Sequence, residues 1–167
     1  MKDPVYFLMA RIDISGGSQG YYRAQLIRSS IEHLDEWWLA GTDYTRHWMA
    51  YGGLWSGAHA DITNQYVRMG VDGGLPLLLA FILVLVGAFS GVGRAWRSAD
   101  ERSANHAEAL VAWAFGCALT AHAAAFVAVS YFDQSVVLLY LTLAAIAAGA
   151  AAHEVQREGP CRWIECD

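Results

Sequence analysis

Three long apolar stretches dominate the chain from Leu75 onward, and a more polar segment precedes them. The first apolar stretch runs from Leu75 to Phe89 without a charged side chain, and eleven of its residues are Leu, Ile, Val or Phe. Each residue of this kind favours insertion near the bilayer centre by about 0.3 to 0.6 kcal/mol. The pattern therefore predicts transmembrane helices at residues 75–92, 109–132 and 136–152.

Residues 1–74 have a different pattern, with short apolar segments separated by glycine and polar residues. A helix is expected over residues 21–38, where apolar positions recur at the spacing of one helix face. A second short helix is expected from Ser56 or Gly57 to about Met69. The predicted fold is therefore all-α: a polytopic helical membrane protein with an outer polar helical loop region followed by three transmembrane helices.

Small residues recur at four-residue spacing within the three apolar stretches. Such pairs let helix backbones approach closely in a membrane. In alanine-rich helices the same pairs also arise from composition alone, which makes this a weak packing signal. The pairs are Gly87 with Gly91, Gly116 with Thr120, and Ala145 with Gly149.

Composition supports a membrane protein and excludes some functions. The hydrophobic fraction is 56% and the charged fraction is 16%, whereas soluble domains have about 25% charged residues. The arginines are scattered rather than gathered in a basic block, which argues against nucleic-acid binding. Cys161 and Cys166 do not show a zinc-binding spacing with histidine partners. The sequence therefore implies no metal and no other cofactor.

The arginines also predict the orientation in the membrane. Three lie in residues 93–108 and two lie in residues 153–167, and the predicted topology puts both segments on one side. Cytoplasmic loops carry an excess of Lys and Arg. We therefore expect a multi-pass protein of a bacterial inner membrane, with residues 1–74 in the periplasm and the C-terminal tail in the cytoplasm.

This orientation creates a difficulty for residues 1–74. The short apolar run near Met1 is not a signal peptide, because Arg11 ends it. A polar segment of this length is a poor candidate for export by one following helix. The simplest expectation is that residues 1–74 form a large outer loop of a longer protein, whose upstream membrane helices would be partners of this chain.

Four sequence elements resemble the bacterial O-antigen ligase and O-antigen polymerase superfamily. They are Arg23 on a predicted helix, then WWLAGTD, HADITNQYV and GVDGGLPLLLAF. In that family a periplasmic loop carries an arginine on a helix, a glycine-containing turn and a His-Asn-x-aromatic-Leu element, followed by a glycine-rich start of a membrane helix. The resemblance covers about residues 20 to 90, and it lies in the order and spacing of the elements.

The sequence departs from the family pattern at one position that matters. Asn64 fits the family asparagine, but the preceding position, where the family has histidine, is Thr63. The nearest histidine is His59, one helical turn earlier on the predicted helix. Either His59 takes the family role from there, or this chain has lost the histidine.

The resemblance implies transfer of a glycan from a polyprenyl-diphosphate carrier, without a metal. Arginine gives bidentate contacts to phosphate, so Arg23 is the first candidate for the diphosphate. A helix beginning near Ser56 would direct its free N–H groups at an anion and would favour the neutral form of His59. Neutral His59 could then accept a proton from a sugar hydroxyl.

Other residues have alternative roles in this hypothesis. Asp61 would orient His59 or act as the base itself. Arg28, Arg46 and Asn64 are the further substrate-binding candidates. Each of these residues also has an ordinary interpretation, as a solvated or hydrogen-bonded surface side chain.

Two other functions fit the sequence as well. The chain could be a non-enzymatic accessory protein of envelope-polysaccharide export, or an inactive fragment. Membrane lipid is an expected partner in every case. A functional site in which Arg23 and His59 converge would favour the enzyme.

Overall fold

The computed structural model describes residues 19–49, 54–56, 59–101, 106–132 and 134–158. The chain divides into two compact units. The first unit contains the described residues up to Ile82 together with Ala124–Tyr131, and the second contains Leu83–Ala123 and the described residues from Phe132 onward. Cys161 and Cys166 lie outside the described residues.

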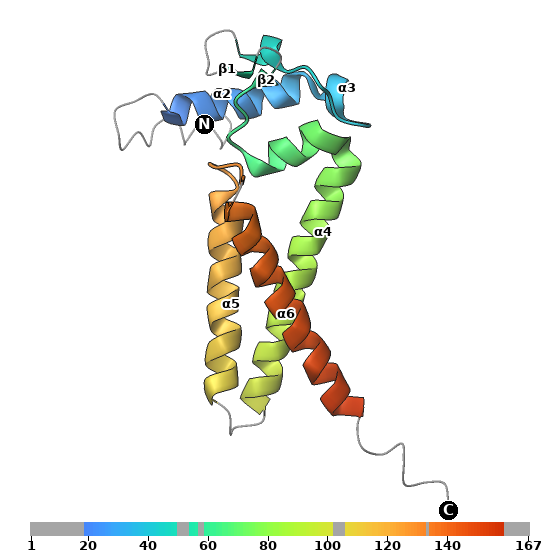
Figure 1. Cartoon of the computed structure of the whole chain (residues 1–167), viewed down its shortest axis with the longest axis vertical. Coiled ribbons are helices and arrows are strands. Elements are labelled where there is room, and N and C mark those ends of the chain that lie inside the picture. The colour runs from blue at the N-terminus through green and yellow to red at the C-terminus, as the bar shows by residue number, and fades with distance from the viewer. Residues whose placement is uncertain (1–18, 50–53, 57–58, 102–105, 133, 159–167) are drawn as a thin grey trace, which may run out of the picture. The chain divides into compact units, whose positions relative to one another are not determined.

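Short elements make up most of the first unit, and long helices make up the second (Figure 1). The first unit begins with helices α2 (Gln19–Glu32) and α3 (Leu34–Trp37), the 3-10 helix η2 (Arg46–Trp48) and strands β1 (Leu54–Ser56) and β2 (His59–Ala60). Helix α4 (Gln65–Glu101) begins in the first unit and ends in the second. Helices α5 (His106–Ala125) and α6 (Gln134–Glu158) follow.

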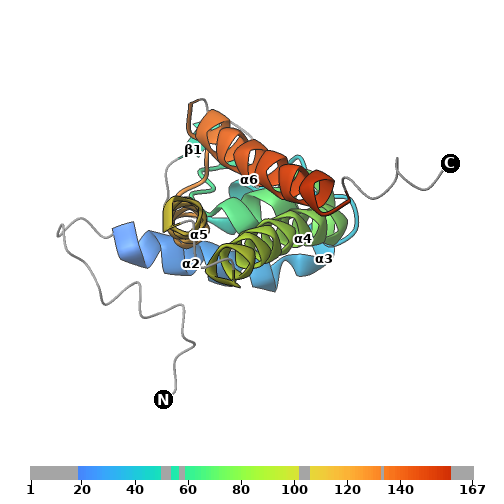
Figure 2. The same cartoon turned by 90° about the horizontal axis from the view of Figure 1, so that it is seen from below.

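Within the part of the chain that the structure describes, three helices are long and apolar enough to cross a membrane: Gln65–Ala99, His106–Ala125 and Gln134–Ala152. This finding confirms the expected all-α, polytopic membrane class. The antiparallel pair β1 and β2 is too short to change that class. Within the second unit, Figure 2 looks nearly along α5, and α6 is inclined to it.

The helix expected over residues 21–38 is interrupted at His33, between α2 and α3. In an unbroken helix the Ser30 carbonyl would accept the N–H of residue 34. Here the indole Nε1 of Trp37 donates to that carbonyl at 2.8 Å. The buried Trp37 ring therefore replaces a backbone bond, and the chain turns at this point.

The second short helix was predicted to begin at Ser56 or Gly57, and this prediction is wrong. Residues 59–60 form strand β2, and the helix begins only at Gln65. The buried backbone N–H of Ala60 donates to Thr45 Oγ1 at 2.9 Å, which holds this segment in an extended form. Asn64 then starts the helix, because asparagine is a strong N-cap residue.

Helix α4 contains a break shortly after its first two turns. Gly73 has φ −159° and ψ 23°, and Gly74 has φ 71° and ψ −170°. The positive φ of Gly74 lies in a region that residues with a side chain rarely adopt. Leu75 N donates to Trp38 O at 2.8 Å, so the loop after α3 supplies an acceptor where the helix is interrupted.

The loop and the break form a contact that we call the clasp: Trp37–Thr42 against Gly70–Leu75. Thr42 N donates to Val71 O at 2.9 Å. Gly41 has φ 83°, and a Cβ on it would meet Val71 O. A Cβ on Gly70 would meet the Trp37 ring. The clasp thus joins WWLAGTD to GVDGGLP, and it requires glycine because the backbones are in close contact.

In the second unit, small residues permit only some of the expected helix contacts. A Cβ on Gly91 would lie 3.4 Å from Ile146 on α6, and a Cβ on Gly116 would lie 3.4 Å from Val92 on α4. A Cβ on Gly87 or Gly149 would meet nothing within 4 Å. Among the residues that the structure describes, Gly91 and Gly116 therefore lie at helix contacts, whereas Gly87 and Gly149 face open space.

Candidate functional site

Arg23 lies on α2 with its side chain half-buried. Its Nε is buried and has no hydrogen-bond partner among the described residues. A buried donor without a partner costs about 1–3 kcal/mol, and more when the group is charged. An anion placed against this guanidinium would remove that cost, so the Arg23 side chain is a candidate anion-binding group.

Tyr22 links α2 to the segment that carries Asp61. The Tyr22 hydroxyl donates to the backbone carbonyl of Asp61 at 2.7 Å. Burial raises the pKa of Tyr22, and the nearby negative charge of Asp61 adds to this effect. The Tyr22 hydroxyl therefore holds the Asp61 backbone, and the charge of Asp61 is near enough to act on that hydroxyl.

Thr63 and Asn64 lie two and three residues after Asp61, and they differ in whether their side-chain polar atoms are hydrogen-bonded. Thr63 Oγ1 is buried without a hydrogen-bond partner among the described residues, as is Arg23 Nε. Asn64 is 6% exposed and uses both polar atoms. Its Oδ1 accepts from Val67 N at 3.0 Å, and its Nδ2 donates to Val127 O at 2.9 Å. Asn64 is therefore the N-cap of α4 and a tie to residues 124–131.

The start of α4 is not arranged as an anion site. Gln65 N donates to Phe126 O at 2.8 Å, and the Gln65 side-chain oxygen accepts from Tyr131 N at 2.7 Å. The first N–H groups of a helix attract anions only when they lack other partners. At Gln65 and Val67 these donors are bonded within the chain.

His59 belongs to strand β2, where it pairs with Ser56. The expectation that it lies in the first turn of a helix is wrong, since His59 is in a strand and the helix begins only at Gln65. The helix dipole therefore supplies no reason for a neutral His59. The position of its side chain lies outside what the structure describes, and its catalytic role stays a prediction.

Arg28 and Arg46 are exposed. Arg28 Nε contacts Glu32 Oε1 at 2.7 Å in an i,i+4 pair on α2. Exposed pairs of this kind contribute little to stability. Arg46 begins the 3-10 helix η2. Of the three candidate arginines, Arg23 has the buried nitrogen that lacks a partner within the described ranges.

Two histidines and a carboxylate gather where α3 meets η2. Glu36 Oε1 lies 2.9 Å from His47 Nε2, and the Trp48 indole donates to Glu36 Oε2 at 3.1 Å. The His33 ring lies 5.0 Å from the His47 ring. Burial alone would raise the pKa of Glu36, but the hydrogen bonds from His47 and Trp48 and the nearby histidines outweigh it and hold the pKa below its ordinary value.

Sequence reasoning missed this group. His33 and Glu36 are three residues apart at the end of a helix, which is a spacing that places two side chains together. That spacing is the sequence feature from which the pair could have been predicted. The third member, His47, is 11 residues beyond Glu36, and only the turn between α3 and η2 brings it back.

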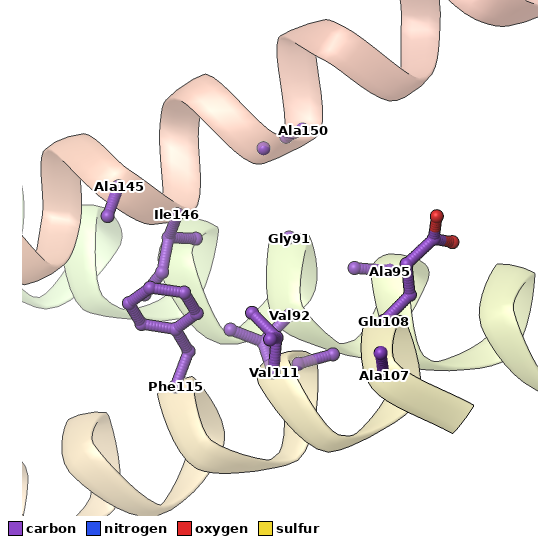
Figure 3. Close-up of a pocket in the computed structure, with 12 residues that line it drawn as sticks. Gly91, Val92, Ala95, Ala107, Glu108, Val111, Phe115, Ala145, Ile146 and Ala150 are labelled. Atoms are coloured by element: carbon purple, nitrogen blue, oxygen red, sulfur yellow. The ribbon is translucent and has the colours of Figure 1, made fainter. Parts of the chain in front are cut away.

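The second unit contains an apolar groove between α4, α5 and α6, with a volume of about 370 Å³ (Figure 3). Its lining is mainly small and aliphatic, and Phe115 and Ile146 are among the largest side chains. Glu108 contributes a carboxylate beside Ala95 and Ala107 (Figure 3). A groove of this composition suits an acyl chain or another helix, and it lacks a set of groups for chemistry.

Comparisons of the chain with protein-family models, with curated proteins and with solved structures found no match. The function must therefore be inferred from the residues of the chain itself.

Proposed function

We propose that this chain is part of a membrane glycan transferase resembling the O-antigen ligases and polymerases. It would use a glycan carried on polyprenyl diphosphate, at the outer face of a bacterial inner membrane. The observation that supports this most directly is the buried Nε of Arg23, which has no hydrogen-bond partner among the described residues, in a chain with helices long and apolar enough to span a membrane. The anion that satisfies Arg23 would be the diphosphate of a membrane-delivered substrate.

The role of Arg23 follows from the chemistry of the leaving group. Glycan transfer from this carrier releases a polyprenyl diphosphate, and negative charge grows on the oxygen that leaves. A guanidinium can donate two parallel N–H bonds to phosphate oxygens and remains charged at every physiological pH. The charge that builds up as the bond breaks would strengthen these contacts and lower the barrier.

The transfer needs one proton acceptor. The oxygen of an acceptor hydroxyl bonds to the anomeric carbon, and the bond between that carbon and the diphosphate oxygen breaks. The diphosphate departs with the electron pair, and the hydroxyl proton passes to a base. Asp61 and His59 are the two candidates, and we favour Asp61 because its backbone carbonyl accepts the hydrogen bond of Tyr22, the residue before Arg23 on α2.

Thr63 supplies a further polar group in the proposed site. Its buried Oγ1 can donate one hydrogen bond and accept others. A bound glycan or phosphate oxygen would satisfy it. This proposal gives the residue at the family histidine position a binding role without asking it to carry a proton.

A binding measurement tests the role of Arg23. The chain in lipid nanodiscs should bind polyprenyl diphosphate, while polyprenyl alcohol should bind much more weakly. Arg23→Ala and Arg23→Lys should each reduce diphosphate affinity at least about tenfold, because neither gives a bidentate contact. Arg68→Ala is the matched control, since Arg68 Nε is already paired with Asp72 at 2.9 Å. Equal affinity in wild type and Arg23→Ala would reject the proposed site.

A transfer assay identifies the base. Removing one positioned proton acceptor typically lowers the rate by about 10²–10⁴-fold. We expect this loss in Asp61→Asn, and the measurement is glycan transfer in membranes at equal protein level. The same loss in His59→Gln with an active Asp61→Asn would assign the base to His59. If both variants and Arg23→Ala transfer normally, the accessory-protein interpretation replaces the enzyme.

A further inference from the structure

The group formed by His33, Glu36 and His47 has a geometry that the proposed glycan transfer does not use. Each residue offers one ligand atom, and these atoms lie within 4.8 Å of one another. Zinc binds nitrogen and carboxylate oxygen at about 2.0–2.2 Å in tetrahedral sites, which puts neighbouring ligand atoms roughly 3.4 Å apart. Small side-chain rotations would therefore bring the three atoms to one ion.

We propose that His33, Glu36 and His47 form a zinc site that joins the end of α3 to η2. Two imidazoles and one carboxylate are a common set of protein ligands for zinc, and three such ligands leave a fourth position for water or another molecule. Imidazole nitrogen also favours zinc over magnesium and calcium, which prefer oxygen ligands. The proposal does not depend on the glycan transferase function.

The groups around the three ligands hold them in the orientation that a metal requires. His33 Nδ1 lies 2.9 Å from Ser29 O, so a proton on Nδ1 leaves Nε2 for the metal. Metal-binding histidines typically hold their second ring nitrogen on a backbone carbonyl or a carboxylate in this way. Trp48 Nε1 donates to Glu36 Oε2, which leaves Oε1 directed at His47.

Stacking fixes the two imidazole planes as well. The His33 ring stacks on Trp48 at 5.7 Å, and the His47 ring stacks on Tyr44 at 5.3 Å. Trp48 is 4% exposed, and Ser29 Oγ donates to its carbonyl, so the support for His33 belongs to the core of the first unit. The ligands themselves are partly exposed, which gives an ion a path from solvent.

Metal titration of the full chain tests the site. The protein, without a histidine tag and treated with a chelator, is titrated with Zn²⁺ against a chromophoric competitor. We expect one high-affinity Zn²⁺ per chain, and a thermal midpoint that rises with Zn²⁺ because the metal binds the folded state. Co²⁺ should give the visible d–d bands of a tetrahedral site without a sulfur-to-cobalt charge-transfer band.

Variants locate the ion. His33→Gln, Glu36→Gln and His47→Gln should each weaken Zn²⁺ binding at least about 100-fold, and Trp48→Phe should weaken it about tenfold because it removes one supporting hydrogen bond. The exposed residues His106 and Glu32 provide matched controls, and His106→Gln and Glu32→Gln should bind as wild type does. His47→Gln alters an exposed side chain, so it keeps the test valid if His33→Gln fails to fold.

Three results would overturn the proposal. One is wild-type protein that binds neither Zn²⁺ nor Co²⁺, which would make the group a surface ion pair with stacked rings. Another is undiminished binding in folded His47→Gln. The third is a sulfur-to-cobalt charge-transfer band, which would move the ion to the cysteines.

Discussion

The two units of this chain are stabilised in different ways. In the first unit, side chains reach distant backbone groups: Tyr22 bonds Asp61 and Thr45 bonds Ala60. In the second unit, the hydroxyls of Ser90, Thr120 and Thr142 bond carbonyls four residues earlier on their own helices. Such a bond keeps the hydroxyl on its own helix, so it does not tie one element to another.

The two units also differ in how far they bury their apolar side chains. The first unit buries Leu26, Trp37 and Trp48 in one hydrophobic cluster. In the second unit, Leu83 is 68% exposed and Tyr140 is 65% exposed. In an 18-residue window of each candidate span, only 11% of the residues are buried. The comparison shows that the first unit specifies its own core, whereas the second presents side chains suited to lipid or to further helices.

Among the variants considered, glycine substitutions should give the largest difference in stability between the two units. Gly74→Ala puts a Cβ at φ 71° against the Leu39 backbone, which should destabilise the first unit by about 3 kcal/mol from strain and overlap together. Gly87→Ala has open space and should be neutral or stabilising by up to about 1 kcal/mol. SDS titration in mixed micelles, followed by tryptophan fluorescence, measures both. Equal effects at the two positions would refute the clasp.

Thr45 offers a test of the long-range hydrogen bonds. Thr45 is 0% exposed, and its Oγ1 accepts the Ala60 N–H. Thr45→Val leaves that N–H buried without its partner, so we expect a loss of about 2 kcal/mol in the free energy of unfolding. Thr45→Ser keeps the hydroxyl and should lose less. A Thr45→Val protein as stable as wild type would show that this bond does not hold β2.

The N-cap of α4 should contribute somewhat less to the free energy of unfolding than the hydrogen bond of Thr45. Asn64→Ala removes the acceptor for Val67 N and the donor to Val127 O, and N-cap losses are typically about 1 kcal/mol. Asn64→Asp keeps the acceptor, so its stability should fall between those of wild type and Asn64→Ala. Denaturation of the three proteins side by side gives the order. Asn64→Asp equal to Asn64→Ala would assign the stabilisation to the Val127 contact instead.

The smallest effect is expected from a hydroxyl in the second unit. Thr142 Oγ1 bonds Leu138 O within α6, and that carbonyl belongs to the helix ladder. Thr142→Val should therefore change the free energy of unfolding by less than about 0.5 kcal/mol. The comparison with Thr45→Val isolates the hydrogen bond, because the side-chain change is the same. A loss at Thr142 as large as at Thr45 would remove the distinction between the units.

The sequence was sufficient for the fold class because long apolar runs without charged residues are typical of membrane helices. It was insufficient around His59, where a local helical pattern competes with a bond from Ala60 to Thr45, 15 residues away. The close approach of Gly41 to Val71 and of Gly74 to Leu39 likewise depends on the three-dimensional path of the chain, which residue type alone does not reveal.

The candidate site shows the same division. The resemblance pointed to Arg23, whose buried nitrogen has no partner among the described residues. It pointed equally to Asn64, whose polar atoms are already hydrogen-bonded within the chain. Residue type and spacing do not reveal whether a polar atom is already satisfied. His33, Glu36 and His47 were missed because their meeting depends on the turn between α3 and η2.

The hydrogen bonds of the clasp have a consequence for membrane depth. In an unbroken α4, Leu75 N would bond Val71 O. The loop supplies Trp38 O to the first and Thr42 N to the second, so both backbone groups are satisfied without water. Lipid cannot provide such partners, and exposed Trp38 is a residue type that favours the headgroup level.

The clasp would therefore mark the boundary of the hydrocarbon layer along α4. At 1.5 Å per residue, the helix from Leu75 crosses a core of about 30 Å near Arg94, which is exposed and charged. Spin labels placed along α4 should accordingly change from water-accessible to lipid-accessible at Leu75 and back near Arg94. A change displaced by two turns would mean that something other than the loop sets the depth of this helix.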